Sequence, residues 1–243
     1  MNRKNFMEKI GVSVATLVLF PWLQSCSDKA KSEVSGNKAR IGIIGTGSRG
    51  CFHINNLLGI QFAEITALCD VYKPHLDNAS AVCPKAKLYS DYRKLLEDDN
   101  VDGVIICTPL HLHAQMSIDT LDAGKHLFCE KSMAYSMEEC KRMYDKWKEG
   151  DRVMLIGQQR LFDPKYVKAM EIIHSGAIGD VVGVRNYWYR NNDWRREVPE
   201  TGLERHINWR LYNEYSRGLM TELACHQIQN GAWAMNLLPE MVM

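Results

Sequence analysis

The chain has 243 residues, of which 46% are hydrophobic, 24% are charged and 9% are aromatic. This composition is typical of a folded globular protein of one or two domains, and it excludes disordered, collagen-like and multi-span membrane proteins. Its 30 Lys and Arg against 29 Asp and Glu give a formal net charge of +1, so the overall charge does not favour nucleic acid as a partner.

The N-terminus has the pattern of a bacterial export signal. Arg3, Lys4 and Lys9 precede the uncharged stretch 11–23, which is shorter than the ~20 residues that a membrane span needs. Cys26 follows Leu-Gln-Ser and resembles the lipidated cysteine of bacterial lipoproteins, whereas the basic start resembles a twin-arginine signal with one arginine replaced by lysine. A cysteine that follows an ordinary signal by chance is the alternative.

This pattern predicts an exported protein. We expect residues 1–25 to be removed and residues 26–38, which are rich in Ser and Lys, to form a flexible tether. If Cys26 is lipidated, the mature protein is a periplasmic lipoprotein held at the membrane by its lipid. The seven other cysteines are an odd number and contain no Cys-x-x-Cys pair, which argues against a disulfide framework or a zinc site.

Short apolar runs alternate with amphipathic segments from residue 39 onwards, as in a parallel sheet with crossover helices. The runs predict strands at 40–45, 64–70, 102–107, 126–129 and 153–157, and the segments predict helices at 49–58, 91–97, 113–123, 137–149 and 164–175. Right-handed connections between them give an α/β domain with a doubly wound parallel sheet of the Rossmann type over residues 39–158.

Residues 159–243 have a different pattern. The segment 181–189 alternates toward aromatic residues and predicts a strand of a second sheet, and 219–237 predicts a helix that packs on it. We therefore expect an incomplete α+β domain for substrate binding and oligomerisation.

A glycine motif, G-x-G-x-x-G, directly follows the first predicted strand and opens the first helix. In that position its glycines permit a tight turn and the close approach of a pyrophosphate. Asp70, at the end of the second strand, can accept hydrogen bonds from a ribose and repel a 2′-phosphate, which favours NAD over NADP; Arg49 leaves NADP open, since a cation can accommodate that phosphate. The predicted cofactor-binding residues here are Gly45, Thr46, Gly47, Ser48, Arg49, Gly50 and Asp70.

Later motifs carry a family resemblance. Thr108-Pro109 with His113 downstream, and then Glu130-Lys131, resemble the Gfo/Idh/MocA oxidoreductases, the family of glucose-fructose oxidoreductase and inositol 2-dehydrogenase. The family motif is Glu-Lys-Pro, whereas this chain has Ser132 in place of the proline. The resemblance implies that Thr108, Pro109, His113, Glu130 and Lys131 bind the cofactor, and that Lys131 also reaches the substrate hydroxyl as a catalytic residue.

A second cluster contains the predicted base. Glu222 and His226 are four residues apart and would share a helix face, and an imidazole beside a carboxylate suits general-base work near neutral pH. The resemblance implies that His226 is the base that contacts substrate and that Glu222 is its acidic partner. Gln229 stands where the family often has a further Asp. Two ligands without a third are poor support for a metal site, so no metal is predicted.

Arg160 follows the predicted strand 153–157 and is expected to approach the cofactor or the substrate. The aromatic and basic residues of 187–190, 194–196 and 209–210 predict either a wall on which a sugar stacks or the packed face of the second sheet together with a solvated loop. Binding of single-stranded nucleic acid is a further alternative.

The resemblance predicts an oxidoreductase that acts on a carbinol of a sugar, polyol or related carbohydrate. Because soluble NAD is cytoplasmic, the export signal further predicts that the NAD is tightly bound. A glycoside hydrolase that works by transient oxidation and elimination is one alternative. Another is an NAD-binding lipoprotein without catalysis. Family members are longer than this chain, so we expect it to be C-terminally truncated. Family members also often form oligomers, which makes a homo-oligomer an expectation for the full-length protein.

Overall fold

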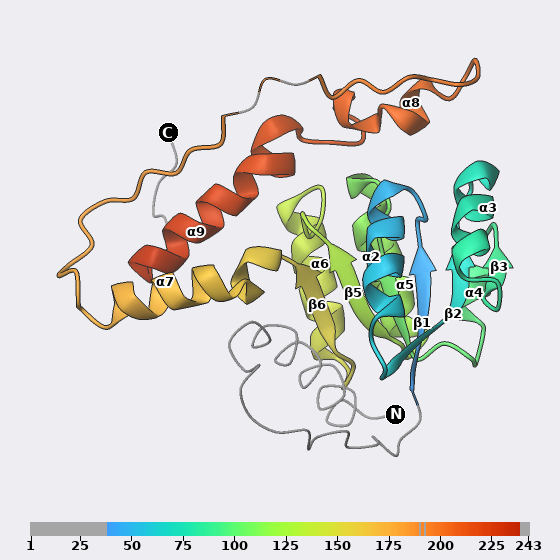
Figure 1. The fold of residues 1–243 in the computed structure, drawn as a ribbon, viewed down its shortest axis with the longest axis horizontal. Coiled ribbons are helices and arrows are strands. Elements are labelled where there is room, and N and C mark those ends of the chain that lie inside the picture. Colours follow the sequence, from blue (N-terminus) through green and yellow to red (C-terminus); the bar gives the residue numbers. More distant parts are fainter. Residues whose placement is uncertain (1–37, 190, 192, 239–243) are drawn as a thin grey trace, which may run out of the picture. The chain divides into compact units, whose positions relative to one another are not determined.

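A computed structural model describes residues 38–189, 191 and 193–238 (Figure 1). The predicted signal peptide, most of the tether and Cys26 lie outside the described residues. The described chain divides into two compact units. The first contains residues 38–108 and Leu112–Ile156, and the second contains Pro109–His111 and residues 157–238.

A six-stranded sheet forms the centre of the first unit. Its strands are β1 (Ala39–Ile44), β2 (Ala63–Cys69), β3 (Lys87–Tyr89), β4 (Gly103–Ile106), β5 (His126–Glu130) and β6 (Met154–Gly157). They follow the order β3-β2-β1-β4-β5-β6, and the pairs from β3 to β5 are parallel. This is the strand order of dinucleotide-binding Rossmann domains, in which the order reverses between the first and fourth strands.

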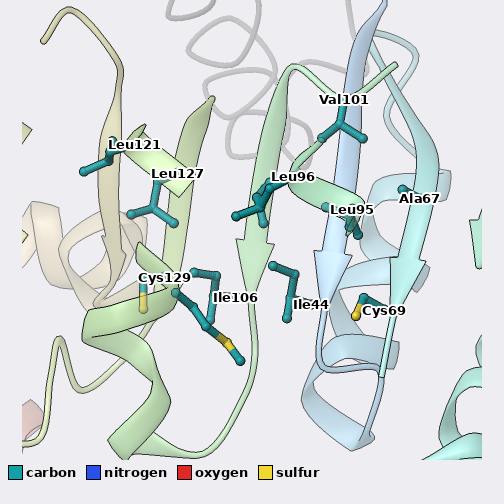
Figure 2. Packing of buried hydrophobic residues seen from close by; sticks show 12 residues of the cluster. Ile44, Ala67, Cys69, Leu95, Leu96, Val101, Ile106, Leu121, Leu127 and Cys129 are labelled. Atoms are coloured by element: carbon teal, nitrogen blue, oxygen red, sulfur yellow. The ribbon is translucent and has the colours of Figure 1, made fainter. Parts of the chain in front are cut away.

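Helices cover both faces of this sheet, so the predicted doubly wound fold is confirmed. The helices are α2 (Ser48–Leu58), α3 (Lys73–Val82), α4 (Tyr92–Leu96), α5 (His113–Asp122) and α6 (Met137–Lys148). Residues of α2 and α3, such as Ile54 and Leu76, form one apolar cluster with β1 and β2. Residues of α4 and α5, such as Leu95 and Leu121, form another with β4 and β5 (Figure 2).

The sequence pattern missed two elements, β3 and α3. The short strand β3 has only three residues, none of them fully buried, and α3 buries only Leu76 and Ala79. Their weak apolar periodicity explains why they were not predicted, since periodicity is the signal from which such elements are read.

The second unit is mainly helical in its described part. It contains α7 (Pro164–His174), α8 (Glu204–Ile207) and α9 (Cys225–Met235), with one-turn helices at Gln159–Phe162 and Trp209–Leu211 and a π-helix at Met220–Ala224. The ring Nε2 of His174 on α7 lies 2.8 Å from the carbonyl oxygen of Trp233 on α9. The π-helix and α9 together cover most of the predicted helix 219–237, which is thus present but begins with a π-helical turn.

The prediction of a strand at 181–189 is wrong. The described residues of this segment form no strand, and Val182, Tyr187 and Tyr189 are largely exposed. A strand needs a hydrogen-bonded neighbour, and the described residues of the second unit supply none, so aromatic alternation alone did not produce a sheet.

A membrane-spanning helix and a metal site each require features that the described residues lack. Among the described residues, no helix combines the length and the apolar composition that crossing a membrane requires, and no group of three or more His, Cys, Asp and Glu side chains is arranged to hold a metal ion. The cysteines within this range, from Cys51 to Cys225, are free thiols.

Candidate active site

The glycine loop lies where the strand order of the sheet reverses. It directly follows β1, and a Cβ added to Gly45 would lie 2.9 Å from the carbonyl group of Cys107, which follows β4. Gly45 also has a φ of +88°, and a Cβ at Gly50 would lie 2.0 Å from the Gly45 oxygen. Both positions therefore require glycine, because a side chain would push apart main chains that are already in contact.

The first turn of α2 can receive an anion. Gly47 precedes the helix and provides no side-chain cap, and no acidic residue occupies the first turn. Ser48, the first helical residue, is exposed. Because the first N–H groups of a helix have no partner within it, and because the N-terminus carries partial positive charge, this turn fits the pyrophosphate of a dinucleotide.

Asp70, directly after β2, accepts hydrogen bonds from the glycine loop. Its Oδ2 accepts hydrogen bonds from the main-chain N–H of Thr46 at 2.7 Å and from the Thr46 hydroxyl at 3.3 Å. Its Oδ1 accepts a hydrogen bond from the Tyr72 N–H at 2.9 Å, and Nδ1 of His75 lies 3.6 Å from Oδ2. The predicted carboxylate thus lies beside the glycine loop, as its expected role requires.

Thr108 lies two residues after β4, with Pro109 after it, next to the one-turn helix Leu110–Leu112. The Thr108 hydroxyl is buried and has no hydrogen-bond partner among the described residues. A buried polar group without a partner is costly, so a polar group of a bound cofactor would stabilise it. This unsatisfied hydroxyl and the uncapped turn of α2 both fit a dinucleotide.

Glu130, at the end of β5, holds a buried negative charge. Its Oε1 accepts hydrogen bonds from Nε of Arg49 at 2.6 Å and from Nε2 of His53 at 2.8 Å. Burial opposes the charge, but the hydrogen bond from His53 and the positive charge of Arg49 outweigh it and hold the pKa of Glu130 below its ordinary value. Sequence reasoning missed His53, although its place four residues after Arg49 puts both on one face of α2.

Lys131 follows β5 directly. Its main-chain N–H donates to Oε2 of Glu130 at 3.2 Å, so the two residues of the predicted Glu-Lys motif are joined by main chain and side chain. The peptide bond between Lys131 and Ser132 is cis. Lys131 itself is partly exposed.

His113 is the first residue of α5, and its ring is buried. Nδ1 lies 2.7 Å from the Ser132 carbonyl oxygen, and Nε2 lies 3.0 Å from the Thr108 carbonyl oxygen. Both nitrogens therefore contact the main chain, between the two motifs on which the family resemblance rests.

The second unit contains the predicted base and its carboxylate. Glu222 lies in the π-helix Met220–Ala224, and His226 lies in the first turn of α9; both are buried. Oε1 of Glu222 accepts a hydrogen bond from the Ser216 hydroxyl at 3.2 Å, and Oε2 accepts one from Nε of Arg210 at 3.2 Å. Such π-turns are frequent at functional sites.

The Arg160 guanidinium lies over two aromatic rings. Its Cζ is 5.4 Å from the ring centre of Tyr166 and 5.3 Å from that of Trp188. Tyr187 and Tyr189 stack at 5.6 Å between ring centres and are exposed. The aromatic residues are thus partly packed by cation–π contacts and partly open. The described residues of this segment do not form the packed face of a second sheet, and the wall on which a sugar stacks stays a prediction.

The strand order and the uncapped N-terminus of α2 at the glycine loop define the first unit as a dinucleotide-binding domain of the Rossmann type. Residues 39–158 match the family model described as "Oxidoreductase family, NAD-binding Rossmann fold", and residues 166–243 match the model of the GFO/IDH/MocA C-terminal domain. The chain therefore belongs to the Gfo/Idh/MocA oxidoreductase family, as the motifs predicted.

Curated relatives include inositol and glycoside enzymes. The chain is 35% identical over 140 residues to a myo-inositol 2-dehydrogenase of Thermotoga maritima, covering 58% of this chain and 42% of the relative. It is 28% identical over 236 residues to a glycosyl hydrolase family 109 protein of Shewanella baltica, covering 87% of this chain and 50% of the relative. The chain thus spans about half the length of these curated relatives.

A solved structure shows the same fold. The scyllo-inositol dehydrogenase of Lactobacillus casei, crystallised with NAD(H) and scyllo-inositol, superposes with a TM-score of 0.67 at 24% identity. The superposition covers 82% of this chain and 57% of that one.

Proposed function

We propose that this protein is an NAD-dependent oxidoreductase that oxidises a carbinol of a polyol, sugar or related carbohydrate. The observation that carries the proposal is the uncapped N-terminus of α2 within a glycine loop that Asp70 closes. Membership of the family and the likeness to an inositol dehydrogenase support the substrate class.

The proposed roles follow from residue chemistry. The N–H groups of the first turn of α2 hold the pyrophosphate, and the Thr108 hydroxyl binds a polar group of the cofactor. NAD, when bound, supplies the hydride acceptor. We assign the hydroxyl proton to the imidazole of His226, and we assign to Lys131 the stabilisation of the oxygen as it gains negative charge. Loss of that proton together with a hydride from the carbinol carbon leaves a ketone.

We also propose that NAD is preferred to NADP. The carboxylate of Asp70 would repel a 2′-phosphate. The cation that left NADP open, Arg49, is engaged by Glu130 at 2.6 Å and lies over the ring of Phe52 at 4.6 Å. The Nε donor of this guanidinium is thus already used by Glu130, which makes Arg49 less available to a 2′-phosphate.

Glycoside cleavage is the second candidate function. It is favoured by the glycosyl hydrolase family 109 relative, whose similarity extends over 87% of this chain. Cleavage by transient oxidation and re-reduction would use the same cofactor site and the same two assigned residues, and it would leave the cofactor unchanged after each turnover.

The test begins with the cofactor. Residues 26–243 are purified and denatured, and released nicotinamide cofactor is measured by chromatography; NAD and NADP are then titrated by calorimetry. Binding of neither would overturn the proposal. Protein that binds NAD is then assayed with myo-inositol for NADH formation, and with nitrophenyl glycosides for release of nitrophenol. NADH formation supports the dehydrogenase, whereas nitrophenol release without net NADH supports the glycosidase.

Export and lipidation at Cys26 are separate proposals that rest on the N-terminal sequence. Mass spectrometry of the N-terminal peptide from expressing cells tests both. An unprocessed Met1 would contradict export, and an unmodified Cys26 in processed protein would contradict the lipid anchor.

A further inference from the structure

Two buried histidines of the first unit have opposite hydrogen-bonding environments. His113 at the start of α5 is 2% exposed, and His126 at the start of β5 is 1% exposed. Their neighbours determine where the ring protons lie, because a carbonyl oxygen can only accept a hydrogen bond and a main-chain N–H can only donate one.

Both ring nitrogens of His113 face acceptors. Nδ1 is 2.7 Å from the Ser132 carbonyl oxygen and Nε2 is 3.0 Å from the Thr108 carbonyl oxygen. Both hydrogen bonds can form only if both nitrogens carry a proton, and an imidazole protonated at both is positively charged. In a neutral ring, one of the two carbonyl oxygens would face an unprotonated nitrogen and lose its hydrogen bond.

His126 requires the other state. The main-chain N–H of Val153 donates to its Nδ1 at 3.1 Å, so this nitrogen must be unprotonated and the ring must be neutral. The two histidines are equally buried, so burial alone cannot explain the difference between them.

The surroundings of His113 support its charge. Burial alone would lower its pKa, but the sulfur of Cys129 on β5 and the carbonyl oxygens of Ser132 and Thr108 favour the charged ring and raise the pKa to about 9. The electrostatic surroundings thus favour the same charged ring that the two hydrogen bonds require.

The two carbonyls belong to the two motifs of the site. Thr108 follows β4 and contributes the buried hydroxyl without a partner, and Ser132 follows Lys131 directly. We propose that His113 is a positioning residue whose charged ring ties the turn after β4 to the turn after β5 and thereby fixes the main chain at Lys131. This proposal rests on the proposed role of Lys131, and it replaces the expected contact of His113 with the cofactor.

Nitrogen NMR of histidine side chains tests the charge without any substrate. At pH 7 we expect the His113 ring to show two protonated nitrogens and to keep them to about pH 8, because its pKa is about 9, while His126 shows one unprotonated nitrogen. Spectra of His113→Gln and His126→Gln assign the signals. A neutral His113 ring at pH 7 would overturn the proposal.

Hydrogen exchange and kinetics test the positioning. In His113→Gln and His113→Phe, we expect faster amide exchange at 130–134. We expect a fall in kcat of about 10- to 100-fold, because small misplacements of a reacting group have large effects, while the Kd for NAD changes less than about threefold. The matched control is His174→Gln, which alters an exposed histidine at 2.8 Å from one carbonyl oxygen. This variant should change neither the amide exchange at 130–134 nor kcat.

The outcomes separate this inference from the proposed function. Unchanged exchange at 130–134 in both variants overturns the positioning role. A loss of NAD affinity that equals the loss of kcat would show that His113 contacts the cofactor, which also overturns it. If the wild-type protein turns over none of the substrates tested, the proposed function fails, but the NMR and exchange results still decide the state of His113.

Discussion

Nε of Arg49, in the first turn of α2, lies 2.6 Å from Oε1 of Glu130 at the end of β5. The pair connects α2, the helix of the glycine loop, to β5, the strand that precedes Lys131. In the sheet, β5 is separated by β4 from β1, the strand that leads into this helix. Only 7% of the Glu130 side chain is exposed, so this contact is screened less by water than an ion pair on the surface.

Glu130→Gln should destabilise the protein near neutral pH. Because Glu130 has a lowered pKa in the folded state, its charge stabilises the fold above the ordinary carboxyl pKa, and this contribution is lost as pH falls through the lowered value. We expect a deficit in the free energy of unfolding of about 1–3 kcal/mol at pH 7, which narrows only as pH falls below the ordinary carboxyl pKa of 4.5. Urea unfolding at several pH values measures it.

Glu97→Gln is the matched control for this change. Glu97 pairs with Lys94 at 2.8 Å, and both side chains are more than 60% exposed, so we expect less than about 0.5 kcal/mol. If the two variants lose the same free energy, or if the deficit of Glu130→Gln does not depend on pH, the stabilising role of the buried carboxylate is contradicted.

Gly50→Ala should weaken NAD binding strongly. The new Cβ would lie 2.0 Å from the Gly45 oxygen, so the glycine loop has to move, at a cost of about 1–3 kcal/mol. Gly59→Ala, at the other end of α2, is the control because its Cβ would lie 3.6 Å from the nearest atom, at an ordinary φ of −82°. Calorimetry with NAD and thermal unfolding check both, and normal NAD affinity in Gly50→Ala would exclude this loop as the pyrophosphate site.

Asp70→Asn should weaken the preference for NAD. The amide lacks the charge that repels a 2′-phosphate, so we expect the ratio of NADP to NAD affinity to rise about tenfold. Asp77→Asn on α3 is the control, since Asp77 is exposed and pairs with Lys73. Equal ratios in wild type and Asp70→Asn would contradict the assignment of Asp70 to the ribose.

Much of the first unit could be predicted, because its strands are apolar runs and its glycine motif stands between a strand and a helix. The contacts that organise the site could not be read from the sequence. Glu130 and His53 are 77 positions apart, and only the strand order brings them together. The prediction for 181–189 was wrong because alternation reports which side chains suit a sheet, whereas a strand also requires a neighbour.

The free energy of unfolding should depend on the pairing of the Glu222 carboxylate with Arg210. Glu222 is 5% exposed in its side chain and Arg210 is 37% exposed, and burial lowers the pKa of Arg210 despite the opposing charge of Glu222. Arg210→Ala would remove the positively charged partner of a buried carboxylate that also accepts from the Ser216 hydroxyl, so we expect a loss of about 1–3 kcal/mol in the free energy of unfolding. Arg205→Ala removes an exposed pair with Glu214 and should cost less than about 1 kcal/mol.

The same variant tests whether Glu222 supports His226. If the pair with Arg210 holds the π-helical turn from which α9 continues, Arg210→Ala should lower kcat and shift the pH dependence of kcat, whereas Arg205→Ala should change neither. Arg210→Lys, which keeps the charge, should restore part of both the stability and the rate. A variant that loses stability but keeps the wild-type pH profile would show that Glu222 and Arg210 maintain the fold of the second unit without influencing the base.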